Sequence, residues 1–276
     1  MDQSLFQYDF IVRGAAGVLF ASITAGLAGT YVVSRRMVFL SGGITHASFG
    51  GIGIGYFLGI NPVLGAAIFG ILSALGIEFL SVRQKIREDS AIGILWALGM
   101  AVGIIFIYLT PGYTPNLMGY LFGSILTVTN ADLIALGAMS ALLIMYFTIF
   151  YRTILYISFD EQYARTYSSY VDLIKYFTTS LIALTIVLNI RMAGVVLVIS
   201  LLTIPPNIAM LFTKAYIKII MFSIIAGFVG TATGYVVSWI AGIPVGATII
   251  FTLVILWTLA KGVSMLRQQP GIIRVG

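Results

Sequence analysis

The chain has 276 residues, of which 60% are hydrophobic and only 9% are charged, and its formal net charge is +6. Soluble globular proteins carry about 25% charged residues, so this composition excludes that class. The apolar runs are long enough for membrane-spanning helices of about 20 residues, whereas an outer-membrane barrel uses alternating segments of about ten. We therefore predict an all-α, polytopic membrane protein in which residues 1–276 form a single transmembrane domain.

The apolar runs predict eight to nine membrane-spanning helices. A further apolar stretch, Leu117–Val128, is too short to cross about 30 Å as a helix, so it is expected to be re-entrant or interfacial. The candidate spans, in chain order, cover residues 14–34, 37–58, 62–82, 91–110, 131–151, 173–190, 193–213, 218–241 and 244–264.

Lysine and arginine are distributed unevenly over the connections between these spans. If the N-terminus lies outside, 13 of the 15 fall in cytoplasmic connections, and only Arg13 and Arg191 fall outside. The positive-inside rule therefore predicts an external N-terminus and a cytoplasmic C-terminus. Because the basic residues mark membrane sidedness, no nucleic-acid partner is expected. The cytoplasmic set is Arg35, Arg36, Arg83, Lys85, Arg87, Arg152, Arg165, Lys175, Lys214, Lys218, Lys261, Arg267 and Arg274.

The segment Met37–Gly59 contains the only histidine of the chain, His46. An ionisable residue in an apolar span is costly and usually marks a substrate path, and imidazole is the commonest protein ligand of zinc. His46 is therefore a candidate metal contact; the alternative is a hydrogen-bonded core histidine. Thr45, Ser41 and Ser48, with water, could complete a loose shell. Small residues recur every four positions beside it and predict a ridge for close helix packing, namely Gly43, Ala47, Gly51, Gly55 and Gly59.

The longest cytoplasmic connection, Tyr151–Lys175, is rich in aromatic residues. Ser158 and Glu161 have the S-x-x-E spacing of a capping box, which predicts a short helix along the inner face. Two interpretations of the aromatic residues stay open. They could form an interfacial belt at headgroup depth, or they could dock a cytoplasmic partner, because tyrosine and arginine dominate protein interfaces.

Three other polar positions lie in or near the spans. Pro205 and Pro206 are expected to break or kink their helix next to Asn207. Glu78 lies near the cytoplasmic end of its span, where snorkelling or a pair with Arg83 would satisfy it. Arg191 is expected either to anchor the outer rim or to receive the acidic surface of another protein.

Several stretches together resemble the ABC-3 type permeases of metal-ion ABC transporters, which import zinc, manganese or iron. They include Phe150–Phe212, REDSAIGILWALGMAVGIIF at Arg87–Phe106, LFGSILTVTNADL at Leu121–Leu133, and Met37–Gly59. They occur in the family's order and cover most of the chain. The resemblance implies a fold like that of type II ABC importers and a location in the bacterial cytoplasmic membrane, with lipid around the spans.

The resemblance also implies partners. It implies a second permease copy, with a homodimer favoured over a heterodimer, and an extracytoplasmic metal-binding protein that delivers the ion. The chain has no G-x-x-x-x-G-K-[ST] phosphate loop, so ATP hydrolysis is expected on a separate cytoplasmic ATPase. The chain itself is then a transport subunit without enzymatic activity or a permanent cofactor, and its cargo is a divalent metal ion. Coupling to the ATPase is assigned to Phe159, Asp160, Glu161, Tyr163 and Arg165.

One departure from the family concerns the metal site. Members of the family have an aspartate four residues before the histidine, where this chain has Gly42, in SGGITH. Two copies of His46 facing one another across a dimer axis would supply two nitrogen ligands instead. Nitrogen ligation favours zinc, although manganese or iron could use the same scaffold. The alternative function is a self-sufficient secondary transporter or channel for a small solute, which needs its own coupling site, and none is evident in the sequence.

Overall fold

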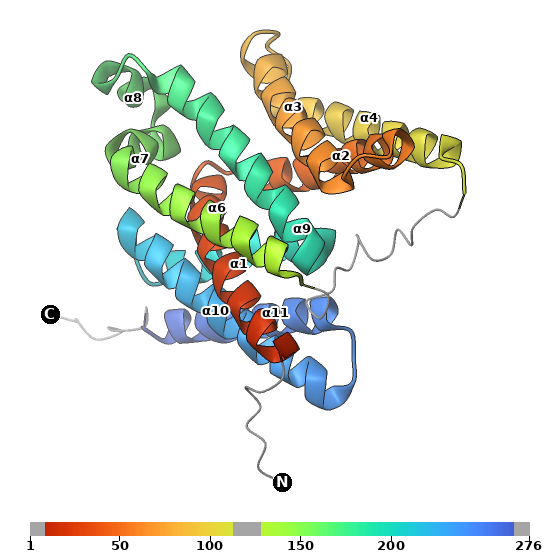
Figure 1. Cartoon of the computed structure of the whole chain (residues 1–276). Coiled ribbons are helices and arrows are strands. Elements are labelled where there is room, and N and C mark those ends of the chain that lie inside the picture. Colours follow the sequence, from red (N-terminus) through yellow and green to blue (C-terminus); the bar gives the residue numbers. More distant parts are fainter. Residues whose placement is uncertain (1–8, 113–127, 268–276) are drawn as a thin grey trace, which may run out of the picture.

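The computed structural model describes residues 9–112 and 128–267. Every regular element of these residues is a helix, which confirms the all-α prediction (Figure 1). The stretch expected to be re-entrant, Leu117–Val128, lies outside the described residues except for Val128. The helices are α1 (Asp9–Ser34), α2 (Val38–Leu58), α3 (Pro62–Val82), α4 (Glu88–Leu109), α6 (Asn130–Ile149), α7 (Tyr151–Phe159), α8 (Glu161–Tyr167), α9 (Val171–Met210), α10 (Tyr216–Ala241) and α11 (Val245–Arg267).

Local sequence explains where several helices begin. Asn61 caps α3 by accepting a hydrogen bond from the backbone N–H of Val63, and Pro62 takes the first helical position, where its missing N–H costs nothing. Thr129 and Asp132 form a reciprocal capping box at the start of α6. These caps satisfy backbone groups that would otherwise be left without partners at the helix ends.

The number of spanning helices differs from the prediction. Seven helices in the described ranges are long and apolar enough to cross a membrane, rather than eight to nine. The helix α2 is not among the seven, because its glycine, serine, threonine and histidine residues lower its mean hydropathy. The spans expected at 173–190 and 193–213 form one helix of 40 residues, α9.

The helix α9 is folded back on itself at Gly194. This residue has φ 78° and ψ 163°, a conformation that glycine adopts without strain and other residues rarely do. At a rise of about 1.5 Å per residue, a straight helix would place Thr185 and Leu202 about 25 Å apart. Both instead line one small cavity. The parts of α9 before and after Gly194 therefore lie against each other, which explains why the sequence pattern indicated two spans.

The helices fall into two groups that share α9. In Figure 1, α2, α3 and α4 lie together, and α9 runs between them and the group of α1, α6, α10 and α11; the same neighbours are in contact in the structure. The ridge prediction is confirmed where α2 meets α3 and α4. A Cβ on Gly51 would lie 2.0 Å from the carbonyl oxygen of Gly65, and one on Gly43 would lie 2.5 Å from Ile92 Cγ2. Side chains at these positions would force the helices apart. Gly59 has another role, as the left-handed C-cap of α2.

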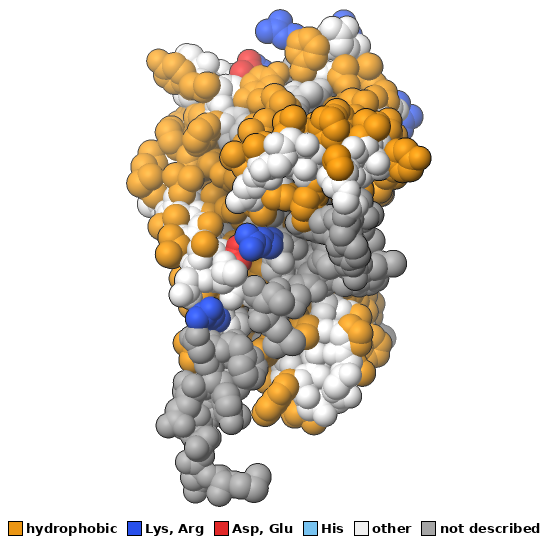
Figure 2. All heavy atoms as spheres, turned by 45° about the vertical axis from the view of Figure 1, so that its right-hand side comes forward, with side chains coloured by type: hydrophobic (Ala, Val, Ile, Leu, Met, Phe, Trp, Pro, Cys, Tyr) orange, Lys and Arg blue, Asp and Glu red, His pale blue; other side chains and the backbone are white. Residues whose placement is uncertain are grey.

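Several basic connections meet at one end of the bundle, which we call the basic end and define by residues 35–37, 83–87, 150–170 and 211–215. Arg35 pairs with Glu161, Ser158 lies within hydrogen-bond distance of Tyr216, and the Arg267 guanidinium lies over the Phe212 ring. Figure 2 shows Lys and Arg side chains at the top of the molecule, above flanks that are largely apolar. This arrangement fits the uneven distribution in the sequence, and the assignment of the basic end to the cytoplasm stays a prediction.

Candidate functional site

His46 lies near the middle of α2 and is half-buried. Its ring is stacked on the indole of Trp96 from α4, with 4.3 Å between the ring centroids and 5° between the ring planes. Among the residues that the structure describes, none hydrogen-bonds to the ring nitrogens, which argues against the alternative of a hydrogen-bonded core histidine. The imidazole therefore packs through one ring face on Trp96, and this contact leaves its nitrogen atoms available for a ligand.

The three hydroxyl groups expected near His46 lie elsewhere on α2. Ser41, Thr45 and Ser48 are buried and share one helical face, and each donates its proton to a backbone carbonyl of its own helix. His46 is one residue beyond Thr45, about 100° further around the helix. Within one copy of the chain, the structure does not bring these hydroxyls together with the imidazole.

Gly42, one helical turn before His46, leaves space for a side chain. A Cβ at this position would be in ordinary van der Waals contact, 3.8 Å from Ile199 Cδ1 and 3.9 Å from Trp96 Cζ3. The residues described in the structure contain no group of three or more histidine or acidic side chains that could hold a metal ion. One copy thus contributes a single imidazole at this place, and a carboxylate could be added at Gly42 without a clash.

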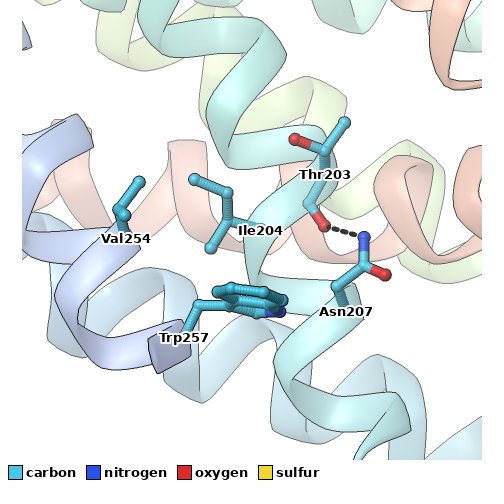
Figure 3. Close-up of a pocket in the computed structure, with 5 residues that line it drawn as sticks. All are labelled: Thr203, Ile204, Asn207, Val254 and Trp257. Carbon is cyan, nitrogen blue, oxygen red and sulfur yellow. Dashed lines mark hydrogen bonds between the residues drawn. The ribbon is translucent and has the colours of Figure 1, made fainter. Parts of the chain in front are cut away.

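Because Ile199 would touch a side chain at Gly42, the second part of α9 lies beside this site, and the same helix leads to a cavity (Figure 3). The cavity has a volume of about 420 Å³ and lies between α9 and α11. Asn207 lies at its edge and donates a hydrogen bond of 2.7 Å from Nδ2 to the carbonyl oxygen of Thr203. The cavity is lined by Thr203, Ile204, Asn207, Val254 and Trp257.

The expected break at Pro205 and Pro206 is not where α9 loses its helical geometry. The backbone stays helical through both prolines to Met210, and the non-helical residue inside α9 is Gly194. Proline fixes φ near −65°, which is compatible with a helix, so the rings remove backbone hydrogen bonds without ending it. The interruption lies instead within three residues of the boundary that the sequence placed between the spans at 173–190 and 193–213.

The connection between α6 and α9 contains the predicted short helix, α8. Its cap is Asp160, which accepts a hydrogen bond from the N–H of Tyr163, and not Ser158, which donates to the carbonyl of Ile154. The helix has two distinct faces. Ala164 is fully buried, whereas Tyr163 is 53% exposed, as is Phe159 at the end of α7, at 61%.

The polar residues of α8 attach it to the bundle at the basic end. One oxygen of Glu161, Oε2, lies 3.1 Å from both Arg35 Nη2 and Lys175 Nζ, and the other oxygen lies 2.9 Å from Arg165 Nη2. Burial of the Glu161 carboxyl would raise its pKa, but Lys175 and Arg165 outweigh burial and hold the pKa below its usual value. Arg165 also pairs with Asp172 at the start of α9.

Sequence reasoning missed the partner of Glu78. The expected pair with Arg83 is wrong, because Glu78 is buried and pairs with Lys175 of α9. The signal was present: Glu78 and Lys175 are opposite charges placed inside the ends of two apolar spans, where each needs a partner. At the other end, Arg191 lies 3.1 Å from Asp132 of α6, which fits a rim anchor between α9 and α6.

Comparisons with known proteins agree on one family. The family model described as the ABC 3 transport family matches residues 7–263. A probable metal transport system membrane protein of Chlamydia pneumoniae is 35% identical over 83% of this chain and 80% of its own. The manganese transport system membrane protein MntC of Listeria innocua is 33% identical over 94% of this chain and 92% of its own. The solved structure of PsaBC from Streptococcus pneumoniae in complex with Fab has a TM-score of 0.82 at 26% identity, covering 93% of this chain and 92% of that chain.

Proposed function

The chain belongs to the ABC 3 transport family and is a permease subunit of a metal ABC transporter; on this premise we propose that it carries a divalent metal ion into the cell past His46. The proposal depends on one observation above all: the only histidine of the chain is half-buried in a helix of the bundle and stacked on Trp96, and no residue that the structure describes hydrogen-bonds to its ring nitrogens. Nitrogen ligation favours zinc as the ion, although the manganese transporter among the relatives supports manganese as the competing cargo.

We propose that the metal site is completed by a second copy of the chain. One copy provides a single imidazole, so two copies of His46 facing one another would provide two nitrogen ligands. Water and the hydroxyls of Ser41, Thr45 and Ser48 could complete a transient shell, which for these hydroxyls requires a rearrangement of α2. A loose shell suits transport, because an ion that binds too tightly does not leave.

We propose that the docking surface for the ATPase is the exposed face formed by the end of α7 and by α8. Phe159 and Tyr163 pack edge-on against Tyr216 and Tyr156, yet each stays more than half exposed at the basic end, as expected of aromatic anchors at a protein interface. Asp160, Glu161 and Arg165 have a different role, because they cap α8 and attach it to the bundle. With the basic end in the cytoplasm of a bacterial cell, the opposite end would receive the ion from an extracytoplasmic metal-binding protein.

Reconstitution of the complex tests the proposed function. The ATPase subunit is expected to co-purify with this chain, and in liposomes that also hold the delivery protein its activity should rise with the transported ion. Comparing Zn²⁺, Mn²⁺ and Fe²⁺ in that assay identifies the cargo. Ion uptake by the purified chain without any ATPase would instead support the alternative of a secondary transporter or channel.

Substitution Gly42→Asp is expected to strengthen metal binding and slow ion release. The new carboxylate would lie one turn before His46 on the same helical face, where the structure has space for it. A carboxylate beside an imidazole is a better ligand set for zinc than an imidazole alone. Equilibrium metal binding and uptake rate measure the two effects. Gly42→Ala fills the same space without a carboxylate, so equal behaviour of the two variants would contradict a metal site beside Gly42.

A further inference from the structure

A buried ion pair at the basic end has no role in the function proposed so far. The side chains of Lys175 and Glu78 are only 6% and 5% exposed, and they join α9 to α3. Burying two charges is expensive, and apolar residues of similar volume often serve stability as well or better. The pair is therefore poorly explained by stability alone, and its neighbours indicate another use.

The pair is connected directly to α8. Lys175 Nζ is also 3.1 Å from Glu161 Oε2, and the same oxygen lies 3.1 Å from Arg35 Nη2. Arg35 is positioned in turn by donating a hydrogen bond of 3.0 Å from Nη1 to the hydroxyl of the buried Tyr31. The carboxylate of Glu161 in α8 thus lies between Arg35, which follows α1, and Lys175 of α9. A displacement of α8 must leave these two cations without Glu161.

The side chain of Glu88 provides a second carboxylate for the cations that Glu161 would leave. Glu88, in the first turn of α4, has one oxygen, Oε1, that is buried and has no hydrogen-bond partner among the described residues. Glu88 lies within electrostatic range of Arg35, Glu78 and Lys175, so it belongs to the same group of charges. A buried, unpaired carboxylate oxygen is costly, which makes Glu88 a ready partner for a cation that loses Glu161.

The position of Glu88 links this end of the molecule to His46. Both Glu88 and Trp96 belong to α4, eight residues or about two helical turns apart. Trp96 is the residue whose indole stacks on His46. A movement at the start of α4 would therefore be carried by a rigid helix to the ring that holds the imidazole. Arg35, Glu78, Glu88, Glu161 and Lys175 together form what we call the charge cluster.

We propose that the charge cluster is the coupling switch of the permease, in which Glu88 replaces Glu161 as the partner of Arg35 when the ATPase displaces α8. The inference rests on the proposed docking of the ATPase at α8. In one state, Glu161 attaches α8 to α1 and α9, and Trp96 covers the His46 ring. In the other state, Glu88 pairs with Arg35, and α4 shifts Trp96 relative to His46. Such an exchange between two discrete pairings is the kind of bistable element that coupling between distant sites requires.

The decisive variant is Glu88→Gln. It removes a charge and leaves the described ion pairs intact, so a merely structural role for Glu88 predicts no effect on assembly or transport. The proposal predicts that the number of ATP molecules hydrolysed per ion transported rises about tenfold, within the usual range of coupling free energies. The measurement uses proteoliposomes with the ATPase and the delivery protein. Asp89→Asn is the matched control, because Asp89 is the next residue and pairs with Arg87 at the surface.

A second readout follows Trp96 itself. The chain has three tryptophans, so Trp239→Phe and Trp257→Phe together leave Trp96 as the only indole. In this background, ATP is expected to change the Trp96 fluorescence, and the change should disappear with Glu88→Gln. Normal coupling and a normal fluorescence change in the Glu88→Gln variant would overturn the switch. Failure of the unaltered chain to bind the ATPase would instead refute the proposed function, so the two failures are distinguishable.

Discussion

Replacing His46 by alanine is expected to lower the rate of metal uptake by about 10- to 100-fold, the loss that follows removal of groups that support a metal site. The imidazole is the only histidine side chain of the chain, and the described residues near it offer no substitute cluster of ligands. Because His46 lies in α2, away from α8, assembly with the ATPase should be unchanged. Uptake of the radioactive or fluorescently detected ion into proteoliposomes gives the rate, and co-purification reports the assembly.

The matched variant is His46→Phe, which keeps an aromatic ring to stack on Trp96 while removing both nitrogens. If His46 acts as a metal contact, the phenylalanine variant transports as poorly as the alanine variant. If the residue serves only to pack against Trp96, the phenylalanine variant transports normally and the site assignment fails. Ser41→Ala, Thr45→Val and Ser48→Ala, measured beside it, show whether the hydroxyls on the other face of α2 contribute.

Truncating two exposed aromatic side chains, Phe159 at the end of α7 and Tyr163 in α8, with Phe159→Ala and Tyr163→Ala combined, is expected to weaken ATPase binding by at least about 30-fold. This factor corresponds to about 2 kcal/mol, the usual threshold for an interface hot spot. Both side chains are more than half exposed, so their removal should leave the fold of the bundle intact. Binding of the purified ATPase to the detergent-solubilised permease measures the loss, and the stability of the permease alone is followed by thermal unfolding.

Tyr108→Ala is the control for this prediction. Tyr108 is 88% exposed and lies near the end of α4 that is opposite the basic end, so its loss should not affect the ATPase. The alternative interpretation of Phe159 and Tyr163 is an interfacial belt at headgroup depth. In that case the double variant would bind the ATPase with unchanged affinity, and the docking surface would have to lie elsewhere.

Most helices could be predicted because a spanning segment must satisfy its own backbone hydrogen bonds in hydrocarbon, which leaves long apolar helices as the solution for such a composition. The prediction at 62–82 matches α3, Pro62–Val82. The count of eight to nine was wrong for two reasons. The helix α2 is less apolar than the seven counted helices, and α9 is a single 40-residue element folded back at Gly194 where the sequence pattern indicated two spans.

The candidate site could be predicted in part. His46 and the small-residue ridge were visible in the sequence, because a lone histidine and a four-residue repeat are local patterns. The stack with Trp96 was not visible, since it joins residues of two helices that are 50 positions apart. The cap of α8 was misassigned because Ser158 and Asp160 both suit a capping position, and only the backbone geometry selects Asp160.

By itself, the sequence determined the all-helical membrane class, the uneven placement of basic residues and the histidine that is the candidate metal contact. Only the tertiary structure decided which charges meet. Glu78, Glu161 and Lys175 come from three different helices, and their pairing depends on how those helices pack. Local spacing carries the information for a helix and its faces, whereas a buried charge is satisfied by whichever partner the packing of distant segments brings within reach. For this reason the charge cluster that we propose as the coupling switch emerged from the structure and not from the sequence.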